Sequence, residues 1–428
     1  MGGITDNREF YTSLRYLGIW SLTALFAGAV GSAVVAGFHW GVLVLQEIFL
    51  STGLPPLAFA VGGAALAGTL TRLDAGSRGE GIPSYIRGVK EEGGVLSPRI
   101  TAVKAASAFA TLASWGSGGY IGPLGRVVSG LTSTSVAMIA PAPGDRSLRR
   151  TAAICGLSAT VAAVTGAPVG GGVFAVEIVQ KRNMRYSDLF PAVLSGCVSV
   201  FLANGLFGGP IVNLTAEAVR MGGRHLPAVL LTVLLAGFGC RAFELFYEGV
   251  SKAFRRESGR AVEVRFAAAA ALSVGLILAV NPAMLGTGGV FLREIFLDAA
   301  AAQGRLGPAV PTAVAVLLMM LVRASAVVLT VGSGQSAGFF APLSQIGMLL
   351  GTFTAVLFGM HGNPGDLHVL QAVGFAGLVA GSLNVPVAAA IIVTETFGAP
   401  FGLVAALASV MVFQINRRHT VYDFEMDS

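Results

Sequence analysis

The chain has 428 residues, of which 54% are hydrophobic and only 12% carry a charged side chain, about half of the roughly 25% that is typical of a soluble domain. This composition excludes a soluble enzyme, a disordered chain and a disulfide scaffold. The net charge is +6, but a chain with so little polar surface cannot build the basic face of a nucleic-acid-binding protein.

Long runs without Asp, Glu, Lys or Arg recur along the whole chain. A helix that crosses a bilayer needs about 20 mostly apolar residues, so twelve uncharged runs of 16 or more residues predict an all-α polytopic membrane protein. The first run is too long for a signal-peptide core and predicts a retained helix. The longest run, 324–365, is interrupted by glycines and a proline and predicts at least two helices that break inside the membrane. In chain order the runs are 16–46, 48–71, 105–125, 127–144, 151–176, 189–216, 225–240, 266–292, 306–322, 324–365, 367–394 and 396–416.

Two segments of the first half return in the second half. Residues 117–124 (SGGYIGPL) match residues 336–343 (SAGFFAPL), and Pro168–Glu177 matches Pro386–Glu395. The offsets of 219 and 218 residues are nearly equal. They predict a single membrane domain made of two homologous halves and a short cytoplasmic tail. The alternative is chance similarity among apolar helices. The predicted ranges are 15–215, 225–420 and 421–428.

Basic residues flank the matching helices differently in the two halves. Two clusters in the first half have no basic counterpart in the second half, where 359–368 and 396–402 contain no Lys or Arg. Cytoplasmic loops carry the positive excess, so the halves are expected to be inverted, as in transporters and channels with broken helices. We expect a multi-pass protein of the plasma (inner) membrane with both termini in the cytoplasm. The clusters are Arg146, Arg149 and Arg150, and Lys181, Arg182 and Arg185.

Three Gly/Pro segments interrupt the apolar sequence, at 79–83, 119–123 and 338–342. Each has a proline where the first turn of a helix accepts one, preceded by glycine, which allows close approach of an ion. A helix that begins inside the bilayer directs unpaired N–H groups and a partial positive charge at its own N-terminus. One such segment alone is more simply a packing glycine or a kink, but three together predict an anion site built from helix starts.

Three lone charges in the apolar sequence invite a functional interpretation. Glu177 and Glu395 lie at equal positions of the repeat. Each is either a structural carboxylate that caps a helix or pairs with Arg or backbone, or, for Glu177, part of a proton path. Arg323 stands alone between two uncharged runs, and we expect it to end a helix and reach the membrane interface.

With these motifs in order, the sequence resembles the CLC family of chloride channels and chloride/proton exchangers, in the prokaryotic form without C-terminal cytoplasmic domains. The segment 79–83 (GEGIP) resembles the family signature GSGIP, and 119–123 (GYIGP) resembles G(K/R)EGP. The third signature, GxFxP, is met in full by 338–342 (GFFAP). A tyrosine after the last membrane helix matches Tyr422. The likeness covers nearly the whole chain.

The resemblance implies a homodimer in a lipid bilayer with a separate anion pathway in each subunit. It implies that the backbone amides near the second and third signatures hold the anion and that the tyrosine hydroxyl donates a hydrogen bond to it from the cytoplasmic side. No domain is expected after the last helix, since the sequence ends at Ser428. The implied anion-binding residues are Glu80, Gly81, Ile121, Gly122, Phe339, Phe340 and Tyr422.

This sequence departs from the family pattern at three positions. Ile121 stands where the family has the glutamate that serves as gate and proton acceptor, and Ile178 stands where many exchangers have a glutamate that relays internal protons. An isoleucine can neither carry a proton nor move a charge into the pore. Glu80 stands where the family has a serine whose hydroxyl meets the anion.

Glu80 leaves three alternatives open, because an ionised carboxylate at an anion site repels the anion. In the first alternative, the Glu80 side chain points to the cytoplasmic water and backbone amides alone select the anion. In the second, Glu80 is a relocated gate, whose carboxylate fills the anion site and leaves when protonated. In the third, the protein transports a species other than chloride.

The sequence therefore predicts transport of small monovalent anions, chloride first, through a path narrowed by Phe340 and Tyr422, and either channel-like or weakly proton-coupled. The alternatives are a chloride/proton exchanger that uses Glu80 as its gate, with Glu177 as a further candidate for the proton path, and a non-conducting scaffold of the same fold. No metal motif and no nucleophile grouping occurs near a broken helix, so we expect neither an enzyme nor a bound metal or cofactor.

Overall fold

The computed structural model describes residues 3–139, 146–179, 185–212, 214, 216, 222–256 and 261–426, without the side chains of 3–16 and 256. Lys181 and Arg182, on which the predicted orientation partly rests, lie outside the described residues. Regular structure in the described part is helical, apart from one isolated β-bridge. The α-helices are α1 Gly3–Ser51, α2 Pro56–Thr71, α3 Ile82–Lys90, α4 Pro98–Ala113, α5 Ile121–Ile139, α6 Arg146–Thr165, α7 Pro168–Glu177, α8 Tyr186–Leu206, α9 Leu226–Arg256, α10 Val262–Val280, α11 Gly289–Leu297, α12 Thr312–Gly332, α13 Phe340–Leu357, α14 Pro364–Leu383, α15 Pro386–Phe397, α16 Gly402–Asn416 and α17 Asp423–Met426. The 3-10 helices are η1 Ala75–Ser77, η2 Gly223–His225, η3 Pro282–Met284, η4 Ala299–Leu306 and η5 Ala399–Phe401.

The helices have the lengths and polarity of a polytopic membrane protein. Among the described residues eight helical segments are long and apolar enough to cross a bilayer, and α2 and α15 are shorter apolar helices. The twelve uncharged runs therefore do not correspond to twelve full spans, because several cross a break. Run 105–125 covers the end of α4 and the start of α5, while run 324–365 divides into α12 and α13 as predicted.

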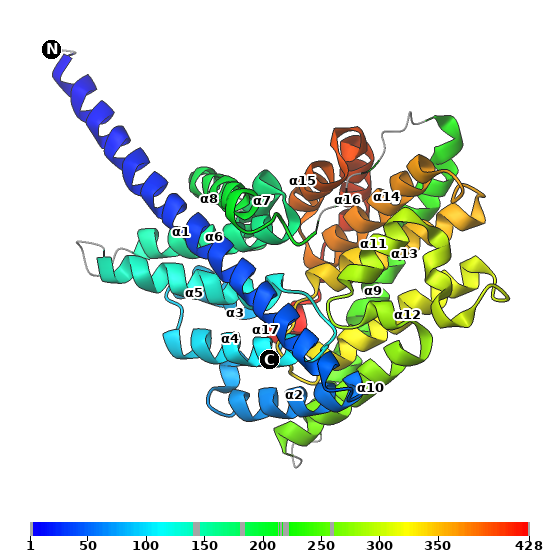
Figure 1. The fold of residues 1–428 in the computed structure, drawn as a ribbon. Coiled ribbons are helices and arrows are strands. Elements are labelled where there is room, and N and C mark those ends of the chain that lie inside the picture. The colour runs from blue at the N-terminus through cyan, green and yellow to red at the C-terminus, as the bar shows by residue number, and fades with distance from the viewer. Residues whose placement is uncertain are drawn as a thin grey trace.

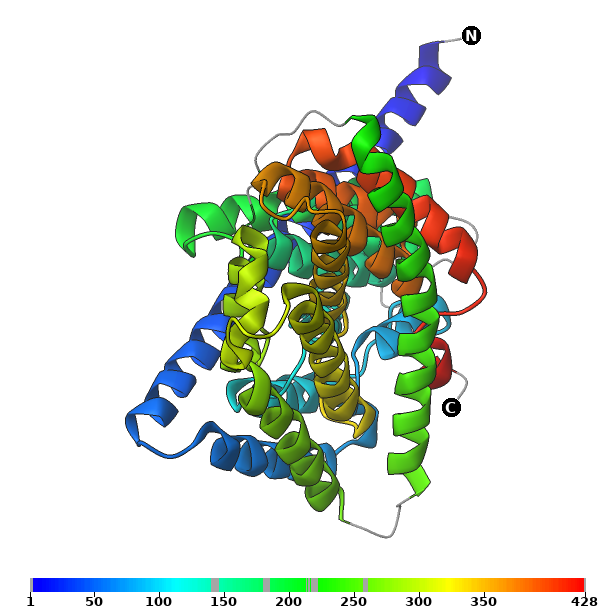
Figure 2. The same cartoon turned by 90° about the vertical axis from the view of Figure 1, so that its right-hand side faces the viewer.

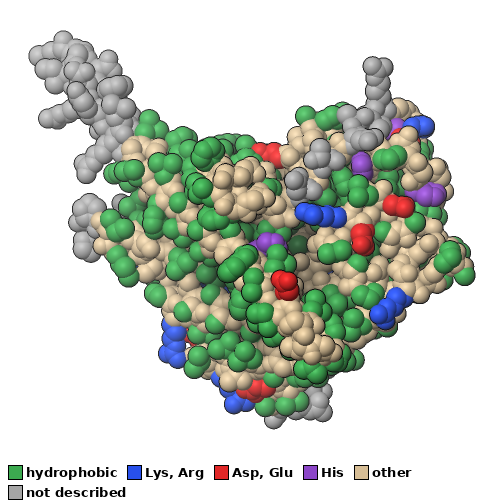
Figure 3. Space-filling view, in the orientation of Figure 1, with side chains coloured by type: hydrophobic (Ala, Val, Ile, Leu, Met, Phe, Trp, Pro, Cys, Tyr) green, Lys and Arg blue, Asp and Glu red, His purple; other side chains and the backbone are tan. Residues whose placement is uncertain are grey.

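Apolar side chains cover much of the outer surface, as contact with lipid requires. Figure 3 shows one such face, where hydrophobic side chains dominate and Lys and Arg are confined to a few places. Large apolar residues on α1, α8, α9 and α16 are widely exposed: Leu22 at 69%, Phe201 at 76%, Phe238 at 72% and Leu403 at 67%. In water such surface would aggregate, so these helices face the lipid or a second membrane chain.

The most deeply buried helix is α14, in which every residue from Gly365 to Leu383 is buried. It lies against α13 through glycines: a Cβ on Gly374 would lie 2.0 Å from the carbonyl oxygen of Gly347. Small residues let two membrane helices approach until their backbones touch, which replaces the hydrophobic driving force that lipid removes. This close pair, in orange and gold in Figures 1 and 2, fixes the position of the α13 N-terminus. The long α1 runs obliquely across α6 and α8 (Figure 1).

Candidate anion site

The three Gly/Pro segments meet inside the protein. The isolated β-bridge joins two of them: Gly119 N donates to Gly338 O at 2.8 Å, and Gly338 N donates to Gly119 O at 2.9 Å. The third segment lies against the same place, since a Cβ on Gly81 would be 2.0 Å from the carbonyl oxygen of Gly122. Glycine is required at these contacts because no larger residue fits.

Each segment leads directly into a helix whose first N–H groups face the meeting point. The helices are α3, α5 and α13, and each has a proline within its first three residues. The residues before α3 and α13, Gly81 and Phe339, offer no capping side chain. The N–H groups of these helix starts therefore remain available to an anion, and the helix dipoles add a partial positive charge.

A carboxylate of the chain itself occupies this place. The backbone N–H of Ile82 donates to Glu80 Oε2 in a short hydrogen bond, and the N–H of Phe339 also lies against the carboxylate. Glu80 Oε1 lies against Gly122, on which a Cβ would be only 2.0 Å away. The Glu80 residue is 2% exposed, so the carboxylate does not point into cytoplasmic water. This is the geometry that the relocated-gate alternative requires.

Lys104 of α4 supports the loop that carries Glu80. Its ammonium group donates a short hydrogen bond to Gly79 O and a longer one, 3.4 Å, to Arg78 O. The residue is 1% exposed, and its positive charge acts on the Glu80 carboxylate. Lys104 was not among the residues predicted from the sequence, although it is the charge that directly precedes the uncharged run 105–125.

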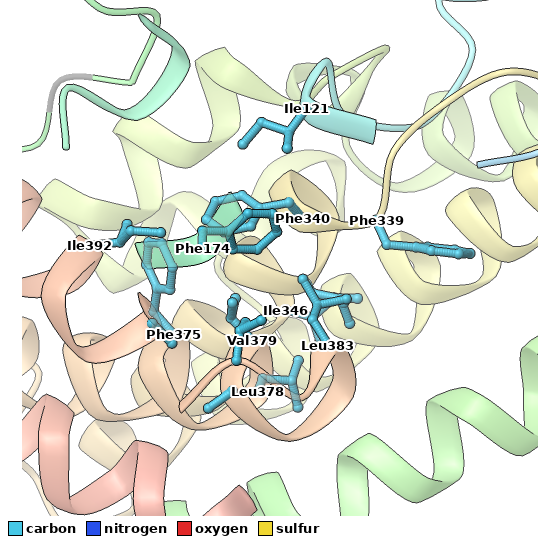
Figure 4. Close-up of a cluster of buried hydrophobic side chains, with 14 of the residues drawn as sticks. Ile121, Phe174, Phe339, Phe340, Ile346, Phe375, Leu378, Val379, Leu383 and Ile392 are labelled. Atoms are coloured by element: carbon cyan, nitrogen blue, oxygen red, sulfur yellow. The ribbon is translucent and has the colours of Figure 1, made fainter. Parts of the chain in front are cut away.

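An apolar cluster lines the site on the side of α5 and α13. Figure 4 shows Ile121 facing Phe340 and Phe174, while Phe339 points the opposite way. The ring of Phe340 lies 5.8 Å from that of Phe174, and Ile121 is 1% exposed. Ile121 itself carries no ionisable group. A cavity beyond Ile121 is lined by Tyr120, Ile121, Val164, Thr165, Ile211, Val212, Leu214, Thr287, Gly289, Leu292, Arg293, Phe340, Ala341, Ser344, Gln345, Phe375 and Thr396.

The other aromatic residues of the predicted site lie on the side of α9 and the C-terminus. Phe339 packs its ring 4.9 Å from that of Tyr247. Tyr422, 3% exposed, lies with its ring centroid 6.5 Å from that of Phe339. The structure thus brings the seven predicted residues into one region, and adds the N–H of Ile82, while Lys104 supports the Glu80 loop.

Glu177 is held by backbone N–H groups and lines a small pocket that Tyr422 also lines. Its two carboxylate oxygens accept hydrogen bonds from Val387 N at 3.1 Å and Ala388 N at 2.8 Å. Both N–H groups belong to the first turn of α15, so the contact is a helix cap. This geometry is that of the structural alternative.

The prediction for Arg323 was wrong. The residue is 0% exposed, inside α12, and does not reach the membrane interface. Its guanidinium donates to the Ser117 hydroxyl at 2.9 Å and to three backbone carbonyls. The prediction failed because Arg323 satisfies the irregular backbone beside the broken helices, which a linear sequence does not display. The carbonyls belong to Met284, Gly286 and Thr287, at 3.2, 3.0 and 2.7 Å.

A polytopic helical protein whose broken helices aim their N-termini at one buried place has the architecture of an ion-transport protein. The chain belongs to the voltage gated chloride channel family, whose model matches residues 62–415. Family membership confirms the resemblance drawn from the three signatures, and agrees with the expectation of a channel or transporter rather than an enzyme.

Known relatives resemble this chain over part or nearly all of their length. The chain is 24% identical over 425 residues to the voltage-gated ClC-type chloride channel ClcB of Citrobacter koseri, a match that covers 94% of this chain and 97% of that relative. It is 25% identical over 273 residues to a chloride/fluoride channel protein of Pseudomonas syringae pv. tomato, covering 62% of this chain and 56% of that protein. A match of 23% identity to the uncharacterized protein MJ0305 of Methanocaldococcus jannaschii covers 63% of this chain and 64% of the relative.

Solved structures of the same fold cover nearly the whole chain. A CLC-type fluoride/proton antiporter is similar with a TM-score of 0.79 at 19% identity, covering 95% of this chain and 98% of that one. A slow cyanobacterial Cl⁻/H⁺ antiporter is similar with a TM-score of 0.76 at 19% identity, covering 96% and 97%. These likenesses confirm the predicted all-α, CLC-like fold class.

Proposed function

We propose that the chain transports small monovalent anions, chloride first, across a membrane, and that the Glu80 carboxylate is its gate. Family membership supports transport. The observation that supports the gate is the Glu80 carboxylate held by the N–H of Ile82, beside that of Phe339, where a free anion would bind. The proposed gate lies at the start of α3, whereas Ile121 is the first residue of α5.

The proposed mechanism exchanges one anion for another. An ionised Glu80 side chain is a tethered anion that accepts charge-assisted hydrogen bonds from helix starts. When it gains a proton, its oxygens become weaker acceptors and the neutral side chain is free to leave. A chloride ion then takes the vacated N–H groups, with the helix dipoles compensating its charge. Each opening therefore consumes one proton at Glu80.

Acid favours the open state in this mechanism. Glu80 lies in the loop before α3, outside the spanning helices, and burial raises its pKa, opposed by the N–H of Ile82. The negative charge of Glu425 raises the pKa further, and Lys104 lowers it. Because the carboxyl binds its proton at a higher pH than an ordinary glutamate, near 4.3, transport rises as the pH falls through this raised pKa.

Anion efflux from liposomes tests the proposal. Wild-type protein, Glu80→Gln and Glu80→Ser are reconstituted, and chloride efflux is followed between about pH 5 and about pH 8. We expect wild-type flux to rise on acidification, and both variants to conduct rapidly with little dependence on pH. Glu47→Gln, at an exposed position of α1, is the matched control and should behave as wild type. A pH profile that neither Glu80 variant alters would contradict the gate.

The same vesicles separate the alternatives for substrate and coupling. Fluoride, bromide and nitrate are compared with chloride, because backbone N–H groups accept all of these anions and relatives of the chain include a chloride/fluoride channel protein. Proton uptake driven by a chloride gradient identifies an exchanger; chloride flux without it identifies a channel-like path. No flux in any condition would support the non-conducting scaffold.

We propose further that the chain is a homodimer of the inner membrane with inverted halves and both termini in the cytoplasm. The exposed apolar residues of α16, such as Leu403 and Leu407, fit a protein or lipid partner. Cross-linking in membranes tests the dimer. Single cysteines at Glu91 and Gly362, both exposed, test the orientation: only the first should be shielded from an impermeant reagent outside intact cells, after Cys197 has been replaced.

A further inference from the structure

A polar pocket lies beside Glu80. Four arginines and two carboxylates line it, and we call it the arginine-lined pocket. Such a concentration of positive charge attracts anions. The pocket-lining residues are Ala75, Gly76, Arg78, Gly79, Glu80, Pro83, Ser84, Arg87, Tyr247, Ser251, Arg255, Arg265, Val331, Gly332, Ser333, Gly334 and Glu425.

The second carboxylate of this pocket belongs to Glu425 of α17, near the C-terminus. Glu425 Oε1 accepts a short hydrogen bond from the Tyr247 hydroxyl. It lies directly on the loop that carries Glu80: a Cβ on Gly79 would be 3.2 Å from Glu425 Oε1, and the backbone N–H of Glu80 faces the same carboxylate. The two glutamates are thus neighbours in space although they are far apart in the sequence.

The C-terminal segment is fixed in this position by contacts of its own. Val421 N donates to Ser382 O at 3.0 Å, which joins the segment to the end of α14. The Arg255 guanidinium lies 4.5 Å from the ring centroid of Phe424, which is a cation–π contact. Thr420 N donates to Asp423 Oδ2 at 2.9 Å, just before α17 begins at Asp423. The position of the Glu425 carboxylate is therefore defined by packing.

The elements that pack around Glu80 and Glu425 carry further charged and titratable groups. Burial raises the pKa of Glu425, while the hydrogen bond from Tyr247 and the positive charges of Lys104 and Arg255 oppose this effect. Two neighbouring carboxyl groups in a buried place do not both ionise easily, and one proton is then shared between them. The titratable and charged groups that line or adjoin this place include Arg78, Glu80, Arg87, Lys104, Tyr247, Lys252, Arg255, Arg265, Tyr422 and Asp423.

We propose that Glu425 delivers the proton that opens the Glu80 gate, taking it from water in the arginine-lined pocket. This inference rests on the proposed function of Glu80. In the step, the Glu425 carboxyl loses its proton and the Glu80 carboxylate gains it, so the total charge is unchanged. Glu425 then regains a proton from the water of the pocket. Neutral Glu80 leaves the amides of the anion site.

Among the described residues, no other acidic side chain is as well placed as Glu425 to pass a proton to Glu80. Glu177 has both oxygens engaged by the start of α15, and Ile178 carries no proton. Glu425 alone shares a pocket with Glu80. It also has a hydroxyl partner, Tyr247, that supports either protonation state.

The test compares Glu425→Gln with Glu425→Asp and wild type in liposomes, with chloride efflux and proton uptake measured on the same samples. Removal of the negative charge lowers the Glu80 pKa, so Glu425→Gln should open at a pH about one unit lower than wild type. Loss of a proton carrier should slow acid-triggered opening about tenfold or more. Glu425→Asp should recover much of the wild-type rate. A wild-type pH profile and opening rate in Glu425→Gln would overturn the proposal.

A double variant distinguishes proton delivery from a mechanical role of the C-terminal segment. If Glu425 acts through Glu80, then Glu80→Gln/Glu425→Gln should conduct as Glu80→Gln alone does, because no gate remains to be protonated. A further change of flux in the double variant would show that the segment obstructs or supports the path itself, and would contradict the proposal. If instead Glu80→Gln retains the wild-type pH profile, it is the gate assignment that fails. Size-exclusion profiles confirm that each variant is folded.

Discussion

Glu177 and Glu395 cap each other's helices. Glu177, the last residue of α7, accepts hydrogen bonds from Val387 N and Ala388 N at 3.1 and 2.8 Å. Glu395, in α15, accepts from Val169 N and Gly170 N at the same two distances. The identical pattern is what a two-fold relation between the predicted halves produces, and we infer that it aligns them.

Loss of either cap should therefore have the same cost. Glu177→Ala and Glu395→Ala each leave two N–H groups at a helix start without their acceptor, which typically costs about 1–2 kcal/mol. Thermal unfolding in detergent should show two similar decreases of Tm. Glu177→Gln tests the proton-path alternative: wild-type-like stability combined with loss of proton uptake would contradict a purely structural role.

Arg323 is expected to be far more important for stability than a surface arginine. Arg323→Met removes four hydrogen bonds and leaves Ser117 and the carbonyls of the 284–287 segment without their donor. Breaking a buried network of this kind costs about 3 kcal/mol or more. Arg72→Met is the control, since Arg72 makes an exposed ion pair with Glu263 worth under about 1 kcal/mol. Equal decreases of Tm in the two variants would contradict this assignment.

The sequence alone was sufficient to predict the fold class and the meeting of the three broken segments. Charge-free runs of membrane length, an internal repeat and the Gly/Pro segments can all be read directly from the linear sequence. The direction of the Glu80 side chain was not available in the same way, because it depends on the N–H of Phe339, which only the folded chain brings near. The contact of Glu425 with the Glu80 loop was missed for the same reason, and because a glutamate near a chain end has no distinctive pattern.

Glycine at position 81 should be indispensable to the anion site. A Cβ at Gly81 would lie 2.0 Å from the Gly122 carbonyl oxygen, so Gly81→Ala must push two helix starts apart. We expect loss of bromide and chloride binding in calorimetry, together with loss of flux. Gly62→Ala in α2 is the control, because nothing lies within 4 Å of the added methyl group and alanine favours a helix by about 0.5–1 kcal/mol. Binding by Gly81→Ala at wild-type affinity would contradict the convergence.

Replacement of Lys104 and replacement of Glu425 should shift the pH at which the gate opens in opposite directions. The Lys104 charge lowers the pKa of Glu80 and the Glu425 charge raises it. Lys104→Met therefore raises the Glu80 pKa, and the gate should open at a pH about one unit higher than in wild type, whereas Glu425→Gln should open at a lower pH. The sign follows from the proton: a higher pKa keeps Glu80 neutral, and the site open, at a higher pH. Chloride efflux against pH measures both midpoints, and two shifts of the same sign would show that Glu80 is not the group that titrates.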